Sequence, residues 1–311
     1  MLIFLFSAAV TLTASASRVD TVVIHSDVMN RDIPVVVIVP TACADGCKNY
    51  VYRLDETVDM NKKKKHKVKV KGQSPTVVTD KRFPVVYMLH GAYGNHKSWL
   101  EIKPDLPRLA DEKQMIFVTP YALNSWYIDS PKMPDFQYET FMTEKLISYV
   151  DKNYPTIAAR KGRAITGLSM GGHGALFLAM RHKDLYGAAG AMSGGVDIRP
   201  FPLNWNLPDV LGEMAANKHE WDSHTVVNQI DRINDGDLWI TFDCGEDDFF
   251  LEVNKDLHKR LLGRGIKHDF TTRPGGHTSE YWANSIDYHL LFFGKFFAMN
   301  NETCRAFGET L

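Results

Sequence analysis

The 311-residue chain has little of several features that mark specialised protein classes. It holds four cysteines, and no Cys/His spacing in it resembles a zinc site. Its N-terminal apolar stretch, residues 2–12, is too short to span a membrane. The formal net charge is −1, which predicts no general attraction to nucleic acid or to an acidic membrane. No internal repeat is present. These absences leave a globular enzyme or binding protein as the expected class.

The composition supplies a sizeable core, with 44% hydrophobic and 11% aromatic residues. Although the length alone would allow two domains, α/β folds often run to roughly 250 residues as one unit. We therefore predict a single catalytic domain over residues 18–311.

The first seventeen residues have the features of a secretory signal peptide. The apolar stretch is followed by Ala14-Ser15-Ala16, a small-residue cleavage pattern, although no Lys or Arg precedes it. We expect a secreted or periplasmic protein. In that compartment Cys43 and Cys47 could close a small disulfide loop; the alternative is two free thiols at the surface.

Apolar runs of strand length alternate with helical patterns along most of the chain. Two early runs, 21–26 and 32–40, are joined by a polar turn and predict an antiparallel hairpin at a sheet edge. The later runs predict a mostly parallel central sheet with helices on both faces, an α/β fold. These later strands are expected in "RFPVVYMLHG", "QMIFVTPYA", "GRAITGLS", "YGAAGAMSGG", "DLWITFDCGEDD" and "KHDFTTRPGG".

Two segments interrupt this alternation. Residues 43–81 contain seven lysines between Lys62 and Lys71, which could bind an anionic polymer; a solvated insertion is the favoured interpretation. Residues 198–233 are rich in Pro, Trp and Asn and follow a strand end, where ligands bind in such sheets. This second segment is expected to form a lid over the site or a simple connection.

The stretch "GLSMG" places Ser169 between a predicted strand and a predicted helix. A serine on such a sharp turn projects its hydroxyl out of the sheet, and Gly167 and Gly171 allow the close approach of strand and helix. The N-terminus of the following helix favours negative charge beside that hydroxyl. The pattern predicts a nucleophile elbow.

A serine nucleophile needs a base, and the base needs an acid. His277 follows the last predicted strand in a glycine-containing loop, which is where an α/β-hydrolase carries its histidine. The loop after the preceding strand offers Asp243, Glu246, Asp247 and Asp248. Asp243 lies at the strand tip, and the pattern does not separate Asp247 from Asp248.

Two backbone N–H groups are needed to hold the negative charge that develops on the substrate oxygen. One is expected from Met170, directly after the nucleophile, and the other from Ala92, with Tyr93 as the next choice. His90 could hold this second loop in shape. His173 is expected to support the elbow.

Taken together, these motifs resemble those of the esterase D-like family of α/β-hydrolases, which includes feruloyl, acetylxylan and tributyrin esterases and S-formylglutathione hydrolases. The resemblance covers about two thirds of the chain or more. It implies an α/β-hydrolase fold, Asp248 as the acid, Ser169 and His277 as its partners, and Ala92 and Met170 as oxyanion donors. It implies no metal or cofactor. The stretches that carry it are "YMLHGAYGNHKSW", "NSWYID", "ITGLSMGGHGALFLAMRH", "FDCGEDDFFL" and "RPGGHTSEYW".

The expected activity is that of a secreted serine carboxylesterase acting on acetyl or feruloyl esters, with acylated carbohydrate as substrate. Trp126 and Trp205 lie near predicted strand ends and could stack on a sugar or a phenolic acyl group. The alternatives are an S-formylglutathione hydrolase or general short-chain esterase, an acyltransferase, and a non-catalytic carbohydrate-binding protein. The segment "GAYGNHKSW" lacks the cysteine usual in formylglutathione hydrolases.

Overall fold

The computed structural model describes residues 17–41 and 81–307, with side chains described up to residue 300. The predicted leader and the lysine-rich segment lie outside these ranges, apart from the boundary residues 17 and 81. The predicted Cys43–Cys47 pairing lies outside them as well.

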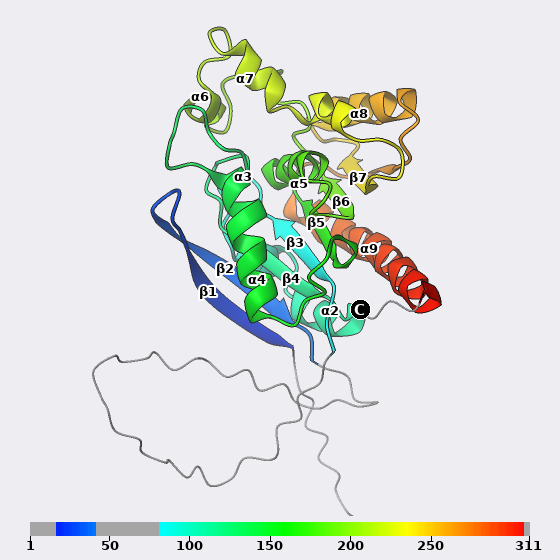
Figure 1. The fold of residues 1–311 in the computed structure, drawn as a ribbon. Coiled ribbons are helices and arrows are strands. Elements are labelled where there is room, and N and C mark those ends of the chain that lie inside the picture. The colour runs from blue at the N-terminus through cyan, green and yellow to red at the C-terminus, as the bar shows by residue number, and fades with distance from the viewer. Residues whose placement is uncertain (1–16, 42–80, 308–311) are drawn as a thin grey trace, which may run out of the picture.

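The described residues form an eight-stranded sheet in the order β1-β2-β4-β3-β5-β6-β7-β8. The β1–β2 and β2–β4 pairs are antiparallel, and the other five pairs are parallel, which confirms the predicted edge hairpin and mostly parallel sheet. Figure 1 shows the hairpin at one side of the molecule. The strands are β1 (Arg18–Ser26), β2 (Arg31–Val39), β3 (Val85–Leu89), β4 (Ile116–Pro120), β5 (Arg163–Gly167), β6 (Ala188–Met192), β7 (Trp239–Gly245) and β8 (Asp269–Arg273).

Helices follow most of the strands, as the alternating pattern predicts. The long helical pattern before β5 is realised as α3, a π-helical stretch (η1, Phe141–Leu146) and α4 in direct succession. The helices are α1 (Ser98–Ile102), α2 (Leu106–Lys113), α3 (Tyr138–Thr140), α4 (Ile147–Asn153), α5 (Met170–Arg181), α6 (Leu207–Leu211), α7 (Lys218–Ser223), α8 (Leu251–Gly263) and α9 (Ser279–Phe307). None of the helices described is long and apolar enough to cross a membrane.

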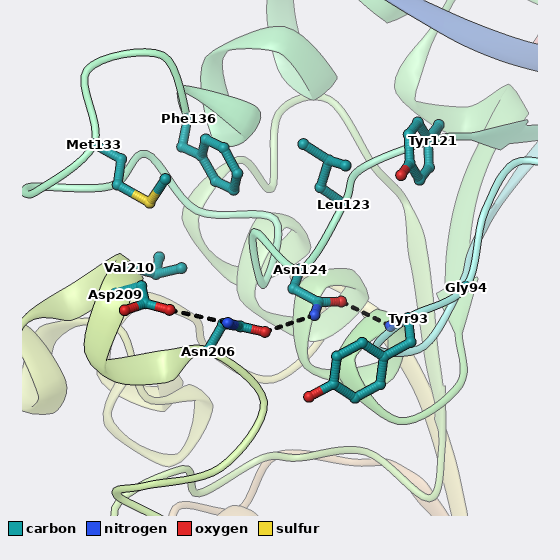
Figure 2. A pocket seen from close by; sticks show the side chains of 10 residues that line it. All are labelled: Tyr93, Gly94, Tyr121, Leu123, Asn124, Met133, Phe136, Asn206, Asp209 and Val210. Carbon is teal, nitrogen blue, oxygen red and sulfur yellow. Dashed lines mark hydrogen bonds between the residues drawn. The ribbon is translucent and has the colours of Figure 1, made fainter.

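The loops at the carboxyl ends of the parallel strands lie at one edge of the sheet, where ligands bind in α/β folds. Residues 198–233 also lie there and contain α6, α7 and two 3₁₀ turns, η3 (Val226–Asn228) and η4 (Ile230–Arg232). A third 3₁₀ turn, η2 (Arg160–Gly162), precedes β5. The loops after β3 and β4, together with α6, line a pocket of about 370 Å³ (Figure 2).

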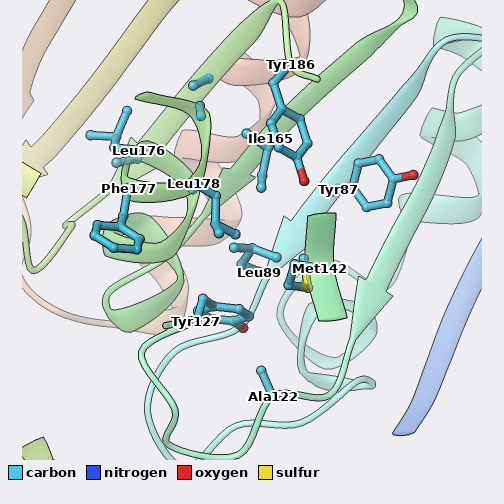
Figure 3. Packing of buried hydrophobic residues seen from close by; sticks show 14 of the residues in the cluster. Tyr87, Leu89, Ala122, Tyr127, Met142, Ile165, Leu176, Phe177, Leu178 and Tyr186 are labelled. Carbon is cyan, nitrogen blue, oxygen red and sulfur yellow. The ribbon is translucent and has the colours of Figure 1, made fainter. Parts of the chain in front are cut away.

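Helices cover both faces of the sheet, so the central strands are buried on both sides. Every residue of β3, β4, β5 and β6 is buried, which explains why most residues of these strands are apolar. Alternate residues of β3 face opposite layers: Tyr87 and Leu89 belong to the buried cluster that includes residues of α4 and α5, whereas Val86 and Met88 belong to the cluster that includes residues of α2 and α9. Figure 3 shows the first layer. These two cores fix β5 and α5 rigidly, and the junction between them carries Ser169.

Candidate active site

Ser169 occupies the junction of β5 and α5 in a strained conformation, with φ 56° and ψ −119°. A positive φ at a non-glycine residue costs on the order of 1–3 kcal/mol and persists only where the surroundings impose it. Here the Ser169 N–H donates to the Met192 carbonyl at 2.9 Å, and the Ser169 carbonyl accepts from the Gly195 N–H at 3.2 Å. Both sides of the turn are thus bonded to β6 and the loop after it, as a nucleophile elbow requires.

The two glycines that flank the elbow allow contacts that no side chain would permit. A Cβ atom on Gly167 would lie 2.3 Å from the Gly171 carbonyl oxygen. A Cβ atom on Gly171 would lie 2.3 Å from the Leu89 carbonyl oxygen of β3. Helix α5 therefore starts in direct backbone contact with β3 and β5.

Three side chains from distant parts of the sequence form one hydrogen-bonded chain. The hydroxyl of Ser169 lies 2.9 Å from Nε2 of His277, and Nδ1 of His277 lies 2.9 Å from Oδ2 of Asp248. The His277 side chain is 17% exposed and that of Asp248 is fully buried. This arrangement allows His277 to take a proton from Ser169 while the carboxylate fixes the orientation of the ring.

Of the two carboxylates that the pattern left open, Asp248 is the one in contact with the histidine. Its other oxygen accepts the Phe250 N–H at 2.8 Å, which orients the carboxylate. Asp247 is exposed, and its N–H donates to the Gly275 carbonyl at 2.9 Å. That backbone bond joins the loop after β7 to the loop after β8, which carries His277.

Asp243 holds both ends of the His277 loop, a role that sequence reasoning missed. This buried carboxylate forms an ion pair at 3.1 Å with Arg273, the last residue of β8. It also accepts the hydroxyl of Tyr281, in the first turn of α9, at 3.0 Å. Five residues, including His277, lie between Arg273 and Ser279. Asp243 therefore fixes the chain directly before this loop through Arg273 and shortly after it through Tyr281.

The same carboxylate is linked to β5, the strand that leads to Ser169. Ser285 donates to Asp243, and Nε2 of His289 lies 3.1 Å from it. Nδ1 of His289 lies 2.9 Å from the hydroxyl of Thr166 in β5. Burial by itself would raise the pKa of Asp243, but the hydrogen bonds and charges of His289, Ser285 and Arg273 outweigh it and leave the pKa below its usual value.

His90 fixes the loop after β3, as expected. Its Nε2 accepts the Ala122 N–H at 3.0 Å, so Nδ1 carries the proton and donates to the Gly91 carbonyl at 2.7 Å. The His90 carbonyl accepts the hydroxyl of Tyr127 at 3.0 Å. Burial lowers the pKa of His90 to about 4, which agrees with a neutral ring between one donor and one acceptor.

The backbone N–H groups near Ser169 fall into two kinds. The Tyr93 N–H donates to Oδ1 of Asn124 at 2.7 Å and is therefore occupied. Those of Ala92 and Met170 have no hydrogen-bond partner among the residues described. Gly91 lies close to Ser169, because a Cβ atom added to it would be 3.3 Å from Cβ of Ser169. The loop after β3 thus passes directly beside Ser169.

Trp126 does not take the substrate-facing position expected of it. Its ring is buried, at 1% exposure, with an edge contact to His173 at 5.2 Å. Its Nε1–H donates to the carbonyl of Trp205 at 3.2 Å. A ring with so little free surface cannot stack on a ligand, and we reassign Trp126 as a support for Trp205. The burial arises because the loop after β4 folds inward over α5.

Trp205 and Phe249 form an apolar wall beside His277. Trp205 is half-buried, and its ring stacks on Phe249 at 5.7 Å. Phe249, which is 51% exposed, lies 4.3 Å from the His277 ring, measured between ring centroids. Phe249 is not predictable as a site residue from the esterase motifs alone, although its position directly after Asp248 is a signal for it.

His173 is fully buried, and its nitrogens face backbone carbonyls. Nδ1 lies 3.1 Å from the Trp126 oxygen and Nε2 lies 2.8 Å from the His224 oxygen. The ring therefore connects the first turn of α5 to the loop after β4 and to residues 198–233. These contacts fit a supporting role near the elbow.

The sheet order and the solved structures similar to this one place the molecule among the α/β-hydrolases. The fold matches that of FphF, a serine hydrolase of Staphylococcus aureus, at a TM-score of 0.71 and 18% identity over 90% of this chain and 99% of that chain. Residues 62–293 match the Esterase family, described as "Putative esterase". The chain belongs to this family, and it is a serine ester hydrolase of the esterase D-like group.

Two further similarities concern named esterases. The chain is 25% identical to an acetyl esterase of Caldicellulosiruptor saccharolyticus over 221 residues, covering 67% of this chain and 82% of the relative. A solved ferulic acid esterase is 28% identical, with a TM-score of 0.67, and the match covers 91% of this chain and all of that one. Both relatives cleave carboxylic esters by name, which agrees with the enzyme class of this chain.

Proposed function

We propose that this protein is a serine carboxylesterase that removes acetyl or feruloyl groups from carbohydrate by means of Ser169, His277 and Asp248. The observation that carries the proposal is the continuous hydrogen-bonded chain through these three side chains, with Ser169 on a strained turn. A merely structural serine would have no need of a histidine and a buried carboxylate in this order.

In the proposed reaction, His277 accepts the proton of Ser169 as its oxygen attacks the ester carbonyl. The N–H groups of Ala92 and Met170 hold the resulting oxyanion, and Asp248 stabilises the protonated imidazole. His277 then gives its proton to the leaving alcohol. In the second half of the reaction, His277 takes a proton from the water that attacks the acyl-enzyme and returns it to the Ser169 oxygen as the acid leaves. Each proton in this sequence therefore moves between His277 and a reacting oxygen.

The substrate class is supported by the named relatives and by the apolar wall beside His277. The similarity to an acetyl esterase and to a ferulic acid esterase favours these acyl groups. Phe249 and Trp205 offer flat apolar surface to an acyl group bound next to the histidine. The predicted leader supports a secreted enzyme. Its catalytic domain would span residues 18–311, and residues 198–233 would cover the site.

The experiment that tests the function is ester hydrolysis by the purified protein and its Ser169→Ala variant. The wild type should hydrolyse 4-nitrophenyl acetate, and the variant should lose at least about a thousandfold in kcat. Circular dichroism should show the same fold for both proteins. Activity of the variant close to that of the wild type would refute Ser169 as the nucleophile.

A further inference from the structure

The pocket shown in Figure 2 lies beside the catalytic serine and is not used by the proposed mechanism. Tyr93 and Gly94 of the loop after β3 form part of its wall. Gly91, which packs against Ser169, lies only two residues before Tyr93. Since consecutive Cα atoms are about 3.8 Å apart, the Tyr93 backbone is within about 8 Å of the Gly91 backbone. A group attached to the ester can therefore reach the pocket from Ser169.

One side of the pocket is a chain of hydrogen-bonded polar side chains. Asn206 donates to Asp209 at 2.9 Å, Asn124 donates to Asn206 at 2.9 Å, and the oxygen of Asn124 accepts the Tyr93 N–H at 2.7 Å. Each carboxamide uses one N–H in this chain and keeps the other, and each carboxamide oxygen keeps a lone pair. The row therefore offers donors and acceptors together, which is what hydroxyl groups need as partners.

The opposite side of the pocket is apolar. Figure 2 shows Met133, Phe136 and Leu123 facing the polar row across the cavity. The ring of Tyr93, 74% exposed, adds a flat aromatic surface at the end of the row. A ligand that fits both sides has polar groups along one edge and an apolar face.

The charges of the lining exclude an anionic ligand. Of the ten described residues around this pocket, none is a lysine, arginine or histidine, and Asp209 is the one carboxylate among them. A ligand carboxylate or phosphate would meet no compensating cation and would be repelled by Asp209. The acidic groups of a glutathione leaving group are therefore poorly matched to this wall.

We propose that this pocket binds the neutral, hydroxyl-rich sugar ring that bears the ester, with Asn124, Asn206 and Asp209 as its hydroxyl partners. The inference rests on the proposed function, because the sugar is the alcohol part of the ester cleaved at Ser169. In this assignment the acyl group lies against Phe249 and Trp205, beside His277. A phenolic acyl group has few hydroxyls and would leave most of the polar row unused.

The test compares two acetyl esters that differ only in their alcohol: 4-nitrophenyl acetate and an acetylated methyl xyloside. Asn206→Ala breaks the middle of the polar row, and we expect kcat/KM to fall about tenfold more for the xyloside than for 4-nitrophenyl acetate. Asn204→Ala is the matched control, because Asn204 is an exposed asparagine of the same segment that does not line the pocket. It should leave the ratio of the two kcat/KM values unchanged.

Three outcomes would overturn the sugar site. One is an equal loss on both esters in Asn206→Ala, and another is no loss on either. The third is a selective loss on methyl ferulate, which carries the acyl group without the sugar and would assign the pocket to the acyl group.

Binding of xylobiose to the Ser169→Ala protein, followed by calorimetry, tests the same site without catalysis. It should be lost when Asn206→Ala is added and retained with Asn204→Ala. A wild type without any esterase activity would refute the proposed function, and this binding experiment would still decide the sugar site. Absence of xylobiose binding in the Ser169→Ala protein would overturn the sugar site alone.

Discussion

Asp248 and His277 are joined by a 2.9 Å contact between Oδ2 and Nδ1, although 29 residues separate them in the sequence. Asp247, one position earlier, is exposed and takes part through its backbone, whereas Asp248 is buried against the ring. The two neighbouring carboxylates therefore have different consequences when they are changed.

Asp248→Asn should lower kcat for 4-nitrophenyl acetate by about a thousandfold or more, because an amide can stabilise the wrong histidine tautomer and cannot compensate the imidazolium charge. Asp247→Asn is the matched control and should retain activity within about threefold, as expected for an exposed side chain. Steady-state kinetics on both variants provides the measurement. The reverse order of the two effects would move the acid to Asp247.

Gly171→Ala should destabilise the protein by at least about 3 kcal/mol, at the upper end of overpacking effects, because its Cβ would meet the Leu89 carbonyl oxygen at 2.3 Å. The displaced backbone leads into the loop beside Ser169, so kcat should fall as well. Gly263→Ala, in α8, meets nothing within 4 Å and should be neutral or slightly stabilising. Urea unfolding compares the two, and equal stabilities would contradict this account of the elbow.

Acid should destabilise the loop after β3 through His90. Its pKa is about 4 in the folded protein against 6.5 ordinarily, so between these values the unfolded chain binds a proton that the folded chain does not. His90 therefore contributes about 3 kcal/mol to the unfolding free energy at neutral pH, and this contribution is lost as the pH falls from 6.5 to 4.

The corresponding experiment is urea unfolding of wild type and His90→Gln at pH 7 and pH 4.5. The decrease in unfolding free energy between these two pH values should be smaller by about 2 kcal/mol in the variant. His219→Gln, at an exposed histidine of α7, should behave like the wild type. An unchanged pH dependence in His90→Gln would show that protonation of His90 is not the cause.

Asp243→Asn should destabilise the fold by about 3 kcal/mol, because it removes the buried charge that pairs with Arg273 and accepts hydrogen bonds from Tyr281 and Ser285. Loosening of the His277 loop should lower kcat at the same time. Asp269→Asn, an exposed site in β8, serves as the control and should change the unfolding free energy by less than about 0.5 kcal/mol. A variant as stable as wild type would exclude the proposed anchoring of the loop.

The sheet and the serine–histidine pair could be predicted from the sequence because their signals are local. Strands such as β3 and β6 are buried on both faces and therefore appear as unbroken apolar runs. Ser169 lies between Gly167 and Gly171. Gly167 is required by a close backbone contact with Gly171, and Gly171 is required by a close backbone contact with β3. The choice of Asp248 over Asp247 needed the resemblance to a family, because two adjacent aspartates in one loop cannot be told apart by residue type or by pattern.

Other parts of the site could not be read from the sequence because they depend on how loops pack. Trp126 was expected at the surface of the site, but the turn after β4 directs its ring into the core. The partners of Asp243 are Arg273 at the end of β8 and Tyr281, Ser285 and His289, which lie four residues apart along α9. That spacing marks one face of a helix, but only the packing of α9 shows that this face meets Asp243. The polar row of the pocket likewise joins Asn124 to Asn206 across two separate loops.

The anchoring of the His277 loop has a consequence for how the enzyme can diversify. Asp243 holds this loop through β7, β8 and α9, and none of those elements contributes to the pocket beside Tyr93. The pocket walls come from the loops after β3 and β4 and from α6. Substitutions of the pocket residues Asn206 and Asp209 should therefore alter which alcohol is accepted while the contact between Asp248 and His277 stays intact, so chemistry and recognition can evolve separately.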